Sequence, residues 1–268
     1  MRLYFSFLIL FVLPVLFLSS CTPQTTVPIG TVNFMQSGGD RQNTLLVFLP
    51  GIHDSAAVFA EEGFVSAVRA SGIKADMIGV EAHLNYYLKK EFLPRLKADV
   101  IAPARRQGYR NIWLIGISLG GFGAIWYDLE NPDELTGIVT LAPYLGEPEV
   151  VAEIAQAGGL AAWHPALNGE IDDQHKIWRG LKSYESRERC EGRVYLGYGR
   201  QDKFATSDGM LAAVLPEMQV FTIEGGHDWS AWRPLWDAIL KSRVLTQSVP
   251  RNGGFRSKGD NAAAFPPQ

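Results

Sequence analysis

The sequence predicts an α/β protein with a mostly parallel central sheet and helices on both faces. Three continuous apolar runs, at residues 45–49, 112–115 and 137–141, are bounded by turn-forming residues and are typical of strands buried on both sides. Segments with helical spacing of apolar residues separate these runs. Such alternation implies right-handed crossovers within one sheet. Residues 193–199 and 218–223 continue the pattern as the last two strands.

The other elements follow from local pattern. In chain order they are a short edge strand at 31–36, a helix-like stretch ending near residue 70, a weaker strand at 77–80, and helices at 87–107, 122–130 and 229–241. The last of these helices carries Trp229, Trp232 and Trp236 with helical spacing. We interpret this stripe as a core-facing surface rather than a ligand site.

Two stretches fall outside the alternation. Residues 146–190 contain helical pieces and a Gly158-Gly159 break but no convincing strand, so they predict a helical, cap-like insertion at one end of the sheet. Residues 246–268 are polar and rich in Gly, Pro and Ala, which predicts a disordered tail. The folded domain is therefore expected to span residues 45–245.

The N-terminus has the features of an export signal. After Met1-Arg2, residues 3–18 are almost wholly apolar but too few to span a bilayer comfortably, so residues 1–20 are interpreted as a signal peptide. The ending Leu18-Ser19-Ser20-Cys21 resembles the lipobox of bacterial lipoproteins. That resemblance implies acylation of Cys21, with chains such as palmitate, as the first residue of the mature protein. A plain cleaved signal and an uncleaved anchor remain alternatives.

The expected location follows from this lipidation. Residues 21–44 would comprise a Thr/Pro/Gln tether, which holds the domain off the membrane, and the possible edge strand. The protein is then exported to the periplasmic side. An outer-membrane position is mildly preferred, because Thr22 is not the aspartate associated with inner-membrane retention in some bacteria.

Composition narrows the function. The net charge of −3 and the lack of a basic stripe argue against a nucleic-acid partner. No His-Glu-x-x-His or Cys-x-x-Cys motif is present, and neither a metal nor an organic cofactor is expected. With Cys21 lipidated, Cys190 stands alone as a structural thiol, so no internal disulfide is expected.

The candidate nucleophile is Ser118. It lies in Gly116-Ile117-Ser118-Leu119-Gly120, between a predicted strand and a predicted helix. The pattern alone is weak, but this context is the one in which a strained turn exposes a serine hydroxyl at the top of a sheet. A serine needs a neighbouring base to act at neutral pH.

His227 is the candidate base and Asp202 the candidate acid. Each follows a late predicted strand, and the order Ser, Asp, His is that of an α/β-hydrolase. His53 is the runner-up base, while the remaining histidines fit no pattern: His83, His164 and His175. The competing acids are interpreted as helix caps, namely Asp208 and Asp228.

Together these residues resemble the α/β-hydrolase superfamily over residues 45–241, and Gly225-Gly226-His227-Asp228-Trp229 is similar to its esterase D and enterochelin-esterase branch. The resemblance implies an oxyanion hole made by two backbone amides. Leu119, after the nucleophile, supplies one at a helix N-terminus. In many members a His-Gly-x sequence supplies the other; here Pro50-Gly51-Ile52 occupies that place, so Ile52 is the candidate.

The expected reaction is hydrolysis of a carboxylic ester or thioester, small or lipid-like, through an acyl-enzyme. The same fold and triad also serve amidases, peptidases, lipases and acyltransferases. A binding lipoprotein without turnover and a structural envelope protein are the alternatives from other classes.

Overall fold

The computed structural model describes residues 23–35, 42–164 and 172–246. Seven strands form one sheet in the order β1-β3-β2-β4-β5-β6-β7. The edge strand β1 pairs antiparallel with β3, and every other pair of neighbouring strands is parallel. The strands are β1 Thr31–Asn33, β2 Thr44–Leu49, β3 Asp76–Val80, β4 Asn111–Ile117, β5 Gly137–Leu141, β6 Val194–Gly199 and β7 Val220–Ile223. The predicted α/β fold is confirmed.

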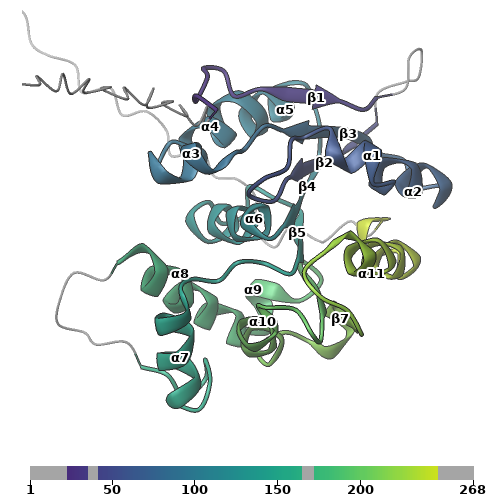
Figure 1. The fold of residues 1–268 in the computed structure, drawn as a ribbon. Coiled ribbons are helices and arrows are strands. Elements are labelled where there is room, and N and C mark those ends of the chain that lie inside the picture. The colour runs from purple at the N-terminus through teal and green to yellow at the C-terminus, as the bar shows by residue number, and fades with distance from the viewer. Residues whose placement is uncertain (1–22, 36–41, 165–171, 247–268) are drawn as a thin grey trace, which may run out of the picture.

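Helices cover both faces of the sheet (Figure 1). One face carries α1 Val58–Glu61, α2 Phe64–Ala70 and α11 Trp229–Lys241. The other carries α3 Leu84–Leu88, α4 Phe92–Arg95, α5 Ala102–Arg106, α6 Leu119–Glu130, α7 Pro148–Gln156, α8 Asp173–Leu181, α9 Arg187–Cys190 and α10 Ala205–Ala212. The π-helical residues Leu96–Ile101 join α4 to α5.

The buried strands have two apolar faces, as their continuous apolar runs predict. In β2, Leu45, Val47 and Leu49 pack toward α6, whereas Leu46 and Phe48 pack toward α2 and α11. This alternation is the two-residue repeat of a strand.

The tryptophan stripe of α11 is mostly core, as expected. Trp232 and Trp236 are buried. The ring of Trp236 stacks on that of Phe64 with centroids 5.3 Å apart, and its indole N–H donates to the Phe64 carbonyl oxygen at 3.1 Å. Burying both the ring and its N–H in this way joins α11 to α2.

The insertion between β5 and β6 contains α7, α8 and α9, which pack on the same face of the sheet as α6 and lie below β5 in Figure 1. His175 links α8 to α7. Its Nδ1 lies 2.7 Å from Asp172 Oδ2, and its Nε2 lies 3.1 Å from Glu153 Oε2 on α7. Trp163 Nε1 also donates to Glu153 Oε1 at 2.7 Å.

The His175 cluster should make the insertion sensitive to pH. The hydrogen bonds that His175 donates to the carboxylates of Glu153 and Asp172 raise the pKa of His175, while those that Glu153 accepts from Trp163 and His175 lower the pKa of Glu153. The raised pKa of His175 stabilises the folded state fully below about pH 6.5, and this stabilisation is lost as the pH rises through the folded-state pKa. The lowered pKa of Glu153 stabilises the folded state above about pH 4, and this stabilisation is lost as the pH falls. We expect the His175→Gln variant to lose the most stability, relative to wild type, between about pH 5 and pH 6.5.

Urea denaturation of both proteins across this range measures the difference, with Arg179→Gln, at an exposed position of the same helix, as the control. A stability difference between wild type and His175→Gln that does not change with pH would contradict the prediction.

The N-terminal segment lies along α3 rather than apart from the domain. Thr26 N–H donates to the Tyr86 hydroxyl at 2.8 Å, and Asn85 Nδ2 donates to the Pro23 carbonyl oxygen at 2.7 Å. Ile29 is buried and its N–H donates to Asp99 Oδ2 at 2.9 Å. The expected signal peptide, Cys21 and, apart from Thr246, the expected C-terminal tail lie outside the described residues.

Candidate active site

Ser118 occupies a sharp turn between β4 and α6. Its backbone has φ 53° and ψ −113°, an uncommon conformation for a residue with a side chain. Three backbone hydrogen bonds hold it there: Ser118 N–H donates to the Leu141 carbonyl oxygen at 2.9 Å, and the Ser118 carbonyl oxygen accepts from Phe122 N–H and Tyr144 N–H, both at 3.0 Å. The end of β5 and the loop after it therefore support the strained turn.

Glycines on both sides of Ser118 allow the turn to form. A Cβ on Gly116 would lie 2.1 Å from the Gly120 carbonyl oxygen, and a Cβ on Gly120 would lie 2.0 Å from the Leu49 carbonyl oxygen. Both separations are far below van der Waals contact. Helix α6 consequently begins at Leu119, three residues before the start expected from the sequence, because its first turn packs directly on the end of β2.

The structure brings Ser118, His227 and Asp202 together. His227 Nε2 lies 3.0 Å from Ser118 Oγ, and His227 Nδ1 lies 2.9 Å from Asp202 Oδ2 and 3.0 Å from its Oδ1. The three residues follow the carboxyl ends of β4, β6 and β7, which share one edge of the parallel sheet. Residues far apart in the sequence thus form one hydrogen-bonded chain.

Asp202 is well placed to remain the partner of His227. Its side chain is fully buried, and Oδ1 also accepts from Phe204 N–H at 2.8 Å. A buried carboxylate that accepts several hydrogen bonds holds one orientation, and with it the tautomer of the imidazole. His227 keeps 14% of its side chain exposed.

Two aromatic rings flank the imidazole of His227. Phe204 and Trp232 each meet it nearly perpendicularly, with centroids 4.9 and 5.0 Å away. The sequence does not indicate either contact: the stripe of α11 predicts a core position for Trp232, and the signal for Phe204 is only its position two residues after Asp202. These contacts restrict rotation of the imidazole and limit its contact with water.

The two candidate oxyanion donors come from different elements near Ser118. Leu119 is the first residue of α6, and Ile52 lies in the loop after β2. A Cβ on the preceding Gly51 would be 3.9 Å from Ser118 Cβ, so this loop passes directly over the serine. Proline replaces the family's usual histidine here, and the loop instead rests on Gly120 through the Leu49 and Pro50 carbonyls.

The other histidines are placed elsewhere. His53 is exposed on the loop after β2, and His175 belongs to the insertion. His83 precedes α3, with its ring 4.6 Å from that of Tyr86. Asp228 caps α11 as expected, because its carboxylate accepts from Ser230 N–H at 2.8 Å.

Asp208 is not the helix cap that the sequence suggested. It lies inside α10, whose N-cap position is Phe204, and it is completely buried. Among the described residues neither of its carboxyl oxygens has a hydrogen-bond partner. Burial, and secondarily the nearby Asp202, raise the pKa of Asp208 well above its usual range.

Replacing Asp208 with Asn should stabilise the protein at neutral pH. Unfolded aspartate is ionised above about pH 3.9, whereas the folded state must either protonate Asp208 or bury its charge. We expect the free energy of unfolding to rise by about 1–3 kcal/mol at pH 7, and this gain to vanish near pH 4. Urea titration of wild type and Asp208→Asn at both pH values measures this gain. An equal gain at pH 7 and pH 4 would contradict the explanation that ionisation of Asp208 is the cause.

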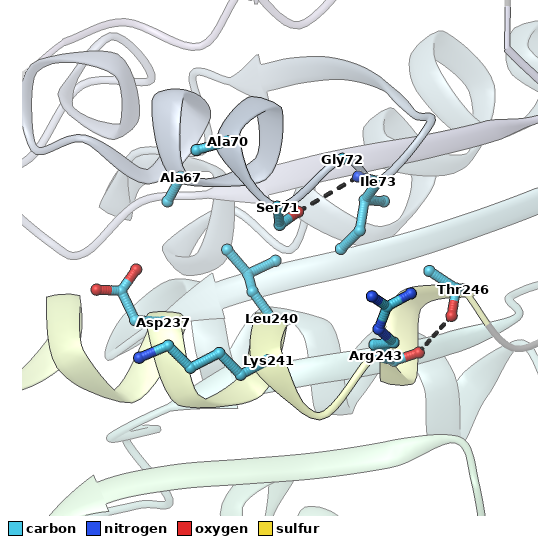
Figure 2. Close-up of a pocket in the computed structure, with 10 residues that line it drawn as sticks. All are labelled: Ala67, Ala70, Ser71, Gly72, Ile73, Asp237, Leu240, Lys241, Arg243 and Thr246. Carbon is cyan, nitrogen blue, oxygen red and sulfur yellow. Dashed lines mark hydrogen bonds between the residues drawn. The ribbon is translucent and has the colours of Figure 1, made fainter.

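A cavity of about 460 Å³ lies away from these residues, between α2 and α11 (Figure 2). It is lined by the ends of both helices, including Ser71, Leu240 and Arg243. Helix α2 leads into the start of β3, whereas Ser118 follows the end of β4, so the cavity belongs to the opposite edge of the sheet.

Within the described ranges, no cluster of three or more His, Cys, Asp or Glu side chains is arranged to hold a metal ion. Cys190 is a buried free thiol whose Sγ lies 3.2 Å from the Tyr184 carbonyl oxygen.

Solved structures share this fold at low sequence identity. Est1E from Butyrivibrio proteoclasticus is 16% identical, with 81% of this chain and 93% of that chain covered and a TM-score of 0.56. A carboxylesterase structure from the thaumarchaeon Nitrososphaera gargenis is 13% identical, with 84% and 99% covered and a TM-score of 0.56. S-formylglutathione hydrolase (FrmB) from Staphylococcus aureus is 14% identical, with 76% and 82% covered and a TM-score of 0.51.

The sheet order, the turn at Ser118 and the structural neighbours show that the chain has the α/β-hydrolase fold. No curated protein sequence matches the chain. The model of the Esterase family, described as "Putative esterase", matches residues 50–242, and the chain belongs to this family. It is accordingly a hydrolase that acts on esters.

Proposed function

We propose that the protein hydrolyses carboxylic esters, or thioesters, through an acyl-enzyme formed on Ser118. The observation that carries this proposal is the continuous chain from Ser118 Oγ through His227 to Asp202, with links of 3.0 and 2.9 Å. These are hydrogen-bond distances between a nucleophile, a base and an acid that orients the base.

In the proposed first step, Ser118 Oγ attacks the ester carbonyl carbon while His227 Nε2 accepts its proton. The carbonyl oxygen becomes an oxyanion, which the amides of Ile52 and Leu119 stabilise. The oxyanion also lies at the N-terminus of α6, where the helix dipole favours negative charge. Asp202 stabilises the imidazolium that forms.

The tetrahedral intermediate then collapses. His227 gives its proton to the leaving alcohol or thiol, and the acyl group stays on Ser118. Water enters, His227 removes one of its protons, and the second tetrahedral intermediate releases the carboxylic acid and restores Ser118. Each proton transfer in this cycle passes through His227, so the proposed reaction needs only the ester and water.

Labelling with a fluorophosphonate probe tests the proposal. The probe phosphonylates an activated serine, and we expect peptide mapping to place the adduct on Ser118 alone. A panel of methyl esters, matched thioesters and matched amides then ranks the leaving groups that the protein accepts. An unlabelled Ser118 together with no hydrolysis would favour a binding protein that keeps the fold without turnover.

We also propose that Cys21 is lipidated and that the protein is a membrane-anchored bacterial lipoprotein on the periplasmic side. The support is the sequence Leu18-Ser19-Ser20-Cys21 after an apolar run. None of the helices in the described part of the chain is long and apolar enough to span a bilayer. Mass spectrometry of the mature N-terminus tests this: a diacylglyceryl-modified Cys21 is expected, and an unmodified one would contradict it.

A further inference from the structure

The point where the chain joins its proposed anchor is held close to the domain. Pro23 and Thr26 are bound to Asn85 and Tyr86 of α3, and Lys89 Nζ donates to Thr25 Oγ1 at 3.1 Å. Cys21 precedes Pro23 by two residues, which span at most about 7 Å. A lipid on Cys21 would therefore enter the bilayer beside α3, and not at the end of a long tether.

Helix α3 lies at the same edge of the sheet as Ser118. It follows the carboxyl end of β3, and Ser118 follows the carboxyl end of the parallel strand β4. Contacts link them: the ring of Tyr87 on α3 lies 6.2 Å from that of Phe122, and Phe122 N–H donates to the Ser118 carbonyl oxygen at 3.0 Å. The anchor and the nucleophile thus share one side of the molecule.

This side also carries exposed apolar side chains. Val27 is 76% exposed, Leu88 on α3 is 68% exposed, and Ile52 on the loop over Ser118 is 42% exposed. Lys89 and Lys90, also exposed, follow Leu88 directly. In the described part of the chain, the other exposed large apolar residues are Met35 and Met218, which lie at the opposite edge, beside the starts of β3 and β7.

We propose that Val27, Leu88, Lys89 and Lys90 form a membrane-facing surface that lies against a bilayer containing anionic headgroups. Apolar side chains at an interface enter the boundary between headgroups and acyl chains, and lysines next to them are attracted to anionic lipid. The orientation follows from the short distance between Cys21 and α3. The proposal rests on lipidation of Cys21. In it, the N-terminal segment holds the domain against the membrane, whereas the sequence alone predicts a tether that holds the domain off the membrane.

The orientation has a consequence that rests on the proposed function. With the Ser118 edge turned toward the lipid, esters that reside in or partition into the bilayer reach the nucleophile without crossing a water layer. Substrates of this kind would then be favoured over freely dissolved esters.

The depth of a nitroxide label tests the surface directly. The full lipidated chain, carrying Leu88→Cys, is reconstituted in vesicles of phosphatidylethanolamine and phosphatidylglycerol and spin-labelled there. Met218→Cys is the matched control, because Met218 is the most exposed of these side chains, at 89%, and lies at the opposite edge. Cys190 is buried and should not react.

We expect the label at position 88 to collide readily with oxygen and several-fold less with a water-soluble nickel chelate, and the label at position 218 to show the reverse. Equal access of the chelate at both positions would overturn the proposal. Lys89→Gln with Lys90→Gln should reduce immersion at position 88, and an unchanged depth would remove the lysines from the surface. The immersion depth of the label is measured without any turnover and can also be measured in the Ser118→Ala variant. A failure of the membrane-surface proposal is therefore distinct from a failure of the esterase proposal.

Discussion

The Ser118→Ala variant is expected to lose hydrolysis of a short p-nitrophenyl ester almost completely, with kcat lower by about 10⁴- to 10⁶-fold. The substitution removes Ser118 Oγ, the atom proposed to form the acyl-enzyme, and leaves His227 paired with Asp202. Labelling by a fluorophosphonate should disappear in parallel. The residual rate would reflect binding and the oxyanion donors alone.

The structure of this variant should stay intact. The backbone hydrogen bonds that hold residue 118 involve Leu141, Phe122 and Tyr144 and not the lost hydroxyl. Ser66→Ala on α2 is the control, because Ser66 lies on the opposite face of the sheet from α6 and its hydroxyl bonds locally to the Gly63 carbonyl oxygen. Hydrolysis and labelling that persist in Ser118→Ala would refute Ser118 as the nucleophile. A loss in both Ser118→Ala and Ser66→Ala would not refute it, because the control would then be affected as well.

Gly120→Ala is expected to have the largest effect on folding. The new Cβ would lie 2.0 Å from the Leu49 carbonyl oxygen and 2.7 Å from that of Pro50, both backbone atoms that cannot rotate away. Helix α6 would have to move from the end of β2, opening the core that both share. Ordinary overpacking costs about 1–3 kcal/mol, and a clash with backbone should exceed this range.

Gly209→Ala in α10 is the matched control. A Cβ there would meet only the Tyr198 hydroxyl, at 3.9 Å, and alanine favours a helix over glycine by about 1 kcal/mol. Thermal unfolding should show a lower Tm, or no folded protein, for Gly120→Ala and a slightly raised Tm for Gly209→Ala. A Gly120→Ala protein as stable as wild type would mean that α6 does not pack on β2 as described.

The local pattern of the chain was enough to predict the α/β fold. Strands buried on both faces must be continuously apolar, and helices that cover them must repeat their apolar residues with helical spacing, so both signals are visible in short windows. That Ser118, Asp202 and His227 lie close together could be predicted for a related reason. Loops that follow parallel strands meet at one edge, whatever their separation along the chain.

Side-chain surroundings could not be predicted in this way. Aspartate is a residue type typical of helix N-caps, yet the turn after β6 places Phe204 at the N-cap of α10 and Asp208 in the interior. Trp232 follows the core stripe of α11 and also touches the imidazole of His227, because α11 begins beside the site. Both outcomes depend on how neighbouring elements pack.

The sequence by itself therefore determined the fold class, the elbow serine and the residues available as its partners, since these depend on periodicity and on order along the chain. Tertiary structure alone decided which groups touch: the rings that flank His227, the loop that rests on Gly120, and the N-terminal segment on α3 that shares the edge of Ser118. Such contacts join residues distant in sequence, and their energies appear only when the chain is folded.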